Sequence, residues 1–143
     1  MKKILFFLFL SLSAFLNANE KNNKLVDLLH SFGNNGEYAQ MDSVYNLIIH
    51  EDHYKQDKLY ALNITLDYAR FLNQKGDSER ANTLLTQIRE SAMALEKFPE
   101  NTMAHQLQEI AAIATYEIAY GQWQNNQLTA ARETAEEAVS QLE

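Results

Sequence analysis

One cluster in the sequence combines residue types that bind metal ions, His50-Glu51-Asp52-His53. Two histidines three residues apart can share one face of a helix, and a carboxylate can serve as an additional ligand. This spacing is common by chance, however, and the HExxH pattern of zinc proteases is absent. We interpret the cluster as a solvated turn at a helix end. His30 and His105 are isolated and are expected to be partly exposed helix residues.

Residue combinations that support catalysis are also missing. Adjacent or neighbouring acids, such as Glu136-Glu137 and Glu96 with Glu100, fall on polar helix faces, where carboxylates are usually solvated. No Ser-His-Asp order, glycine-rich phosphate loop or activated nucleophile can be recognised. The chain has no cysteine, which excludes thiol catalysis, thiolate zinc sites and disulfides. The sequence therefore predicts a protein that is not an enzyme and has no metal or cofactor.

A stripe of large side chains late in the sequence is more informative. Ile113, Tyr116, Tyr120 and Trp123 are separated by three, four and three residues, which places them on one face of a helix. Such a stripe either is core, buried against a neighbouring helix, or forms part of a binding surface, where aromatic residues contribute much of the energy. The spacing leaves both interpretations open.

The N-terminus is typical of a secretory signal peptide. Met1-Lys2-Lys3 precedes an apolar run that extends from Ile4 to Leu16, and the small residue Ala18 follows. A run of about 13 residues is shorter than the ~20 that a membrane-spanning helix needs. We expect cleavage after Ala18, with Asn19 as an alternative, and a mature protein in the periplasm. An uncleaved anchor is the minority interpretation.

The charge balance argues against a nucleic-acid partner. The formal net charge is −7, from 12 basic and 19 acidic residues, and removing Lys2 and Lys3 gives 10 − 19 = −9. Phosphate contacts require a basic surface. The expected mature protein is soluble and acidic, and it does not associate with membranes.

Apolar residues at spacings of three and four predict six amphipathic helices. Their approximate ranges are 22–32, 37–50, 55–74, 79–97, 100–125 and 128–142. The breaks between them include Gly33-Asn34-Asn35-Gly36, Lys75-Gly76-Asp77 and Pro99, because glycine and proline interrupt helices. Valine is scarce and unbranched residues dominate, which also favours helices over strands. The sequence predicts one all-α domain over residues 20–143.

Three of the predicted turns can be superposed. They read GEYAQ at 36–40, GDSER at 76–80 and NQLTA at 126–130. The flanking helices place Ala69 opposite Ala81 and Ala119 opposite Ala131, and such small residues allow helix backbones to approach closely. The chain thus resembles the tetratricopeptide repeat (TPR), a helix-turn-helix unit that stacks into a right-handed superhelix, or α-solenoid. The resemblance implies about three degenerate repeats of antiparallel helix pairs.

The copies depart from the family pattern at several positions. The first copy has Leu29 and Met41 at the two small positions, and the third has Gln122 where an apolar residue is usual. The copies begin 40 and then 50 residues apart, rather than about 34. The helices flanking Pro99 must therefore be longer than in a standard repeat.

In the family, the first helix of each repeat lines a concave groove that holds an extended peptide. By this resemblance the second copy supplies Asn63, Leu66, Arg70, Asn73 and Gln74, and the third supplies Tyr116, Tyr120 and Trp123. Arg70 could hold a carboxylate through two hydrogen bonds, and the amides could bind peptide backbone. An ordinary solvated face is the alternative interpretation of the polar set.

We therefore expect an exported, non-enzymatic helical repeat protein that binds a protein or peptide partner in the cell envelope. Two alternatives stay open. The chain could be a structural bundle that self-associates through the aromatic stripe, or an immunity-type protein that neutralises a toxin. Small size, export and acidity fit the last of these without favouring it.

Overall fold

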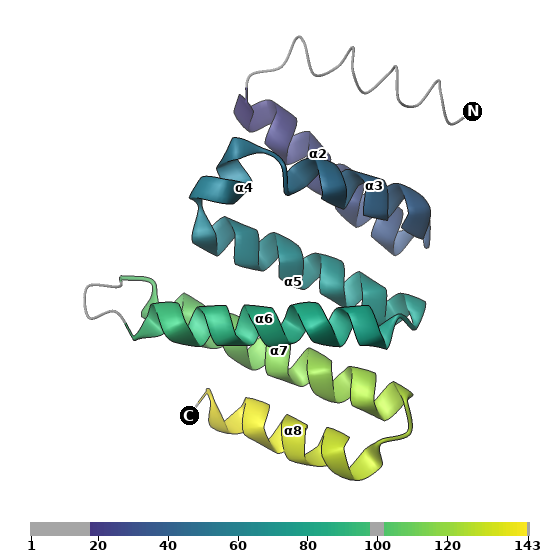
Figure 1. Ribbon diagram of the computed structural model, residues 1–143, viewed down its shortest axis with the longest axis vertical. Coiled ribbons are helices and arrows are strands. Elements are labelled where there is room, and N and C mark those ends of the chain that lie inside the picture. The colour runs from purple at the N-terminus through teal and green to yellow at the C-terminus, as the bar shows by residue number, and fades with distance from the viewer. Residues whose placement is uncertain (1–17, 98–101, 143) are drawn as a thin grey trace. The chain divides into compact units, whose positions relative to one another are not determined.

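The structure is a computed structural model that describes residues 18–97 and 102–142 (Figure 1). Over these ranges the chain forms seven α-helices and no strand. The all-α prediction is therefore confirmed. The apolar part of the predicted signal peptide and the predicted break at Pro99 lie outside the described residues.

The helices follow one another with short connections. In chain order they are α2 (Ala18–Asn34), α3 (Tyr38–Ile48), α4 (Asp52–Gln56), α5 (Lys58–Lys75), α6 (Ser78–Glu96), α7 (Ala104–Gln124) and α8 (Leu128–Ser140). The six longer helices correspond to the six predicted segments, with ends that differ by a few residues. The short helix α4 was not predicted.

Helix α4 corrects the expectation of a simple turn at residues 50–53. His50 and Glu51 form the turn, whereas Asp52 and His53 already belong to α4. The predicted helix at 55–74 is divided at Asp57, whose backbone is extended with φ −99° and ψ 99°. The Asp57 carboxylate accepts a hydrogen bond of 2.9 Å from the backbone N–H of Tyr60 and so caps α5. The capped start of α5 therefore lies at Lys58.

The chain divides into two units, one up to Lys55 and one from Gln56 onwards. In the first unit α2 packs against α3. An ion pair of 2.7 Å between Lys21 Nζ and Glu51 Oε1 joins α2 to the turn after α3. The buried apolar residues of this unit are Leu25, Leu29, Met41, Val44, Tyr45 and Ile48.

In the second unit α6 packs against both α5 and α7, and α7 packs against α8. The buried positions of α7 carry mainly small side chains, including Ala111, Ala112, Ala114 and Ala119. Close approach is most evident at Gly121, where a Cβ atom would lie 3.1 Å from Oδ1 of Asn73 on α5. Small residues on α7 thus allow its neighbours to pack tightly around it.

The three superposed turns have the same backbone geometry. Gly36, Gly76 and Asn126 all have positive φ, at 72°, 86° and 60°. The next residue in each turn, Glu37, Asp77 or Gln127, donates its N–H to a carbonyl five residues earlier, at 2.8, 2.9 and 2.9 Å. Together with the bond that precedes it, this contact forms a Schellman motif, which satisfies helix carbonyls through a left-handed residue. Asparagine replaces glycine in the third turn because it tolerates this conformation.

The residues at the small positions before and after each turn are buried in all three copies. They are Leu29 and Met41, Ala69 and Ala81, and Ala119 and Ala131. Gln122 is half-buried, and its side-chain oxygen is enclosed with no hydrogen-bond partner in the described part of the chain. The departures that the sequence shows are therefore accommodated without a change in turn geometry.

Candidate functional site

The aromatic stripe of α7 lies on the surface of the second unit. Tyr116 is 57% exposed and Trp123 is 59% exposed, while Tyr120 and Ile113 are half-buried. The packing faces of α7 are filled instead by alanines, Leu107, Ile110 and Ile118. Of the two interpretations that the spacing left open, burial of the whole stripe in the core is wrong. Two large aromatic side chains are available to solvent.

Tyr120 and Trp123 are arranged as a pair at the C-terminal end of α7. Their ring centroids are 5.9 Å apart, with an angle of 29° between the planes. Gln124 follows and connects this pair to α6. Its Nε2 donates to the Tyr120 hydroxyl at 3.2 Å, and its Oε1 accepts from Ser78 Oγ at 3.3 Å. The orientation of the aromatic pair is thus supported by contacts within α7 and to the start of α6.

A hollow of about 530 Å³ opens beside Trp123. Its walls come from three places in the second unit: the α5–α6 turn, the C-terminal end of α7 with the turn that follows, and the start of α8. The lining residues are Gly76, Ser78, Trp123, Gln124, Asn125, Asn126 and Leu128. Among the described residues that line it, none is charged. The sequence analysis missed this hollow, because its residues belong to two turns 50 residues apart.

The polar residues predicted on α5 are only partly exposed. Asn63 and Gln74 lie on the surface, and the Asn63 side chain donates to the carbonyl of Leu59 at 3.0 Å. Leu66 and Asn73 are buried, which contradicts their predicted place on an open binding face. Helical spacing did not reveal this burial because a residue on the edge of a helix is covered only when a neighbouring helix comes close.

Arg70 is also occupied within the chain. Its Nε donates to Glu117 Oε1 on α7 at 3.0 Å; the Arg70 side chain is 50% exposed and that of Glu117 is 11% exposed. The predicted role of Arg70 in holding a partner's carboxylate therefore has to compete with an internal carboxylate. A charge-assisted pair of this kind fixes both side chains in one geometry.

Asn73 completes the contact between α5 and α7. Its Nδ2 donates to the backbone carbonyl of Glu117 at 2.9 Å and lies 3.4 Å from Glu117 Oε2. Its Oδ1 is buried without a partner in the described residues and faces the space left by Gly121. Arg70, Asn73 and Glu117 thus form a structural contact rather than an open site.

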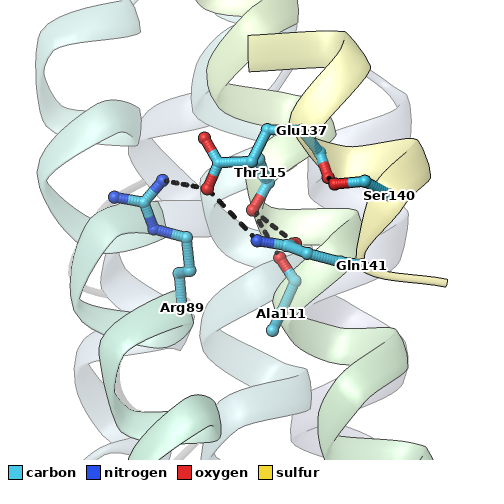
Figure 2. A network of polar contacts seen from close by, with 6 residues as sticks. All are labelled: Arg89, Ala111, Thr115, Glu137, Ser140 and Gln141. Carbon is cyan, nitrogen blue, oxygen red and sulfur yellow. Dashed lines mark hydrogen bonds and ion pairs between the residues drawn. The ribbon is translucent and has the colours of Figure 1, made fainter. Parts of the chain in front are cut away.

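A second polar network fixes the end of α8 (Figure 2). Thr115 Oγ1 on α7 lies 2.8 Å from the carbonyl of Ala111 and 3.0 Å from Oε1 of Gln141. The hydroxyl has one proton, so it donates to one of these two acceptors at a time. Gln141 Nε2 donates to Glu137 Oε1 at 3.3 Å, and Arg89 Nη1 of α6 lies 3.6 Å from the same oxygen. These contacts connect α6 and α7 to the residues at the end of α8.

The described residues contain no group of three or more His, Asp or Glu side chains that could hold a metal ion. In the cluster at residues 50–53, His50 Nδ1 lies 2.6 Å from the carbonyl of Asn46, while His53 belongs to α4. The two histidines are therefore placed on different elements. No helix among the described residues is both long and apolar enough to span a bilayer.

Comparison with known proteins provides no relative. No protein-family model, curated protein or solved structure matches the chain.

Proposed function

We propose that the chain is an exported, non-enzymatic helical repeat protein that binds a protein or peptide partner in the cell envelope. The observation that carries this proposal is the exposure of Tyr116 and Trp123 on a helix whose other faces are buried. Exposed aromatic side chains hold apolar surface in water, and burying that surface against a partner is favourable. Aromatic residues are also enriched among those that dominate interface energies.

The proposed architecture is a stack of TPR-like repeats. The pairs α2–α3, α5–α6 and α7–α8 are each joined by a turn with one left-handed residue and the same hydrogen bonds. Equal turn geometry at three places supports a repeated unit. On this proposal α5 and α7 are the first helices of their repeats, and their exposed residues face the partner.

The proposed partner-binding surface is narrower than the one predicted from sequence. It retains Tyr116, Tyr120 and Trp123 on α7, with Asn63 and Gln74 on α5 as polar contacts. It excludes Leu66 and Asn73, which are buried. Arg70 stays at its edge, since half of its side chain is exposed while its Nε is bonded to Glu117. The charge of −9 on the proposed mature chain (10 basic and 19 acidic residues) favours a partner that is neutral or basic at its contact surface.

Site-specific photo-cross-linking tests the proposal. A benzoylphenylalanine replaces Tyr116 in cells that make the full chain, and a matched variant carries it in place of Asn82, an exposed residue of α6. We expect a discrete adduct of higher mass from position 116 and none from position 82. Absence of an adduct at position 116, or the same adducts at both positions, would contradict a binding surface on α7.

Self-association is the second candidate, and one observation favours it. Leu128, Val139 and Leu142 are each more than half exposed, so α8 and the turn after it present apolar side chains to solvent. An open end of a repeat stack usually needs a polar cap. In the same cross-linking experiment, an adduct with twice the mass of the chain identifies this alternative.

A further inference from the structure

The hollow beside Trp123 combines an exposed ring with polar walls. Trp123 forms one wall and is oriented by its stacking on Tyr120 at 5.9 Å. Leu128, 58% exposed, adds apolar surface at the start of α8. Pockets that bind small molecules typically occupy about 300–1,000 Å³, and the hollow of about 530 Å³ lies within this range.

The remaining walls are polar and uncharged. Gln124 is held between the Ser78 and Tyr120 hydroxyls at 3.3 and 3.2 Å. Asn125 and Asn126 are exposed, and their side chains make no hydrogen bond within the described part of the chain. A carboxamide offers both donors and acceptors, so these three side chains can bond groups of either kind. Charged residues make up 22% of the chain, yet none of the described residues that line the hollow is charged.

We propose that this hollow binds a neutral saccharide, with one face of a sugar ring stacked on Trp123. A pyranose ring has a face of C–H groups and a rim of hydroxyls, and each hydroxyl both donates and accepts. The C–H face suits the exposed indole, and the rim suits Gln124, Asn125 and Asn126. Trp123 belongs both to this hollow and to the proposed partner-binding surface, whereas Tyr116 does not line the hollow.

Other ligand classes fit the lining less well. An anion lacks a Lys, Arg or His partner among the described lining residues, and a cation lacks a carboxylate. A purely apolar ligand would displace the water that is hydrogen-bonded to the carboxamides and would supply no hydrogen bonds of its own. Leaving these polar groups without partners would reduce the binding free energy. An extended peptide could also place a proline on the indole, and the experiment distinguishes that case.

Trp123 is the only tryptophan in the chain, so its fluorescence reports on the hollow directly. The full chain is titrated with chitotriose and with maltotriose as neutral saccharide probes, and with decaproline as the peptide probe. We expect a saturable change in Trp123 emission with at least one saccharide, half-complete at about 1 mM or below. Decaproline should produce no saturable change.

Two variants remove carboxamides from the hollow. Gln124→Ala removes the side chain that connects Ser78 and Tyr120, and Asn126→Gly removes a carboxamide while keeping a residue suited to φ 60°. Each should raise the half-saturation concentration by about fivefold or more. Asn82→Ala, an exposed polar truncation on α6 away from the lining residues, should leave it unchanged and serves as the control.

Three results would overturn the proposal. They are a lack of saturable change with both saccharides, a response to decaproline alone, and equal titration curves for the parent chain and both carboxamide variants. Circular dichroism of each variant establishes that the helices are retained. Because cross-linking at position 116 does not depend on the hollow, failure of one proposal leaves the other open to its own test.

Discussion

Glu117 places a carboxylate at the contact between α5 and α7, where its side chain is 11% exposed. Arg70 and Asn73 supply the hydrogen bonds that keep this position favourable. Removing a partner from an enclosed carboxylate costs more than the contact itself contributes, because the charge is left poorly solvated. Half of the Arg70 side chain is exposed, so in its absence water can supply part of the stabilisation that the guanidinium gives to the Glu117 carboxylate.

Arg70→Ala is therefore expected to destabilise the chain by about 1–2 kcal/mol. Urea denaturation followed by circular dichroism measures the free energy of unfolding. Arg132→Ala is the matched control, because it breaks the Arg132–Glu136 pair, whose side chains are 80% and 64% exposed. It should cause no measurable change. If Arg70→Ala is equally neutral, the pair with Glu117 does not form in solution.

Trp123→Ala should have only a small effect on folding despite the size of the side chain. Trp123 is 59% exposed, and the substitution mainly abolishes the stacking of its ring on Tyr120, which is worth about 0.5–1.5 kcal/mol. Leu85→Ala provides the comparison, because Leu85 is fully buried and its truncation should cost about 2–5 kcal/mol. Unfolding of both variants is followed by circular dichroism, because Trp123→Ala has no tryptophan for fluorescence. A decrease of several kcal/mol in the free energy of unfolding for Trp123→Ala would place the ring in the core.

Some of the candidate site residues could be predicted from the sequence. Helical spacing correctly grouped Tyr116, Tyr120 and Trp123 on one face, because that follows from 3.6 residues per turn. It did not determine which faces of α7 would be covered. Asn73 faces Gly121, 48 residues later in the chain. A Cβ atom at Gly121 would lie only 3.1 Å from Oδ1 of Asn73, so the close contact between α5 and α7 relies on a residue without a side chain.

Among the elements, the turns give the clearest relation between sequence and structure. Gly76 has φ 86°, a conformation that costs an L-residue with a Cβ atom about 1–2 kcal/mol. A Cβ there would meet nothing within 4 Å, so the cost is conformational and not steric. Gly76→Ala should therefore lower the free energy of unfolding by about 1 kcal/mol.

Asn126→Gly is the matched substitution in the third turn. Its φ of 60° already suits glycine, so we expect a change of less than about 0.5 kcal/mol. Urea denaturation of both variants tests whether the two turns share one backbone geometry. If Gly76→Ala causes no decrease in stability, the left-handed residue is not required in this turn, and a decrease of about 1 kcal/mol for Asn126→Gly would contradict the expected match of glycine to φ 60°.

Most helices could be predicted because their apolar residues repeat with the period of a helix and their ends carry glycine or asparagine. Helix α4 could not, because its five residues give too short a pattern and none of them is buried. Asp57 separates it from α5: its backbone is extended, and its carboxylate accepts a hydrogen bond from the N–H of Tyr60. Aspartate is common both at caps and on exposed helix faces, so its identity alone did not indicate a boundary.

For the whole molecule, the class of fold followed from composition and periodicity, while the proposed stack of repeats rests on geometry. The equivalence of Gly36, Gly76 and Asn126 was visible as a weak sequence alignment. Their shared positive φ and hydrogen bonds make the three turns physically equivalent. The division into units at Lys55 was not predictable, because no proline-rich or low-complexity linker marks it.

The proposed export also concerns the whole molecule, because cleavage of a signal peptide would change which residues are present in the folded protein. The proposed cut after Ala18 removes only the first residue of α2, which runs from Ala18 to Asn34. The remaining chain therefore keeps every described helix, and its charge becomes −9 (10 basic and 19 acidic residues). We expect the intact mass of the protein from a periplasmic extract to correspond to residues 19–143.

The position of the cut can be tested by substitution. Signal cleavage requires small residues next to the cut, so Ala18→Glu should leave most of the protein unprocessed. Asn23→Ala, an exposed change within α2, should be processed normally and serves as the control. An unprocessed chain in the cytoplasm for the parent sequence would contradict export. The partner that contacts Tyr116 would then not be a protein of the cell envelope. The exposed surface of α7 would instead be expected to bind a cytoplasmic partner.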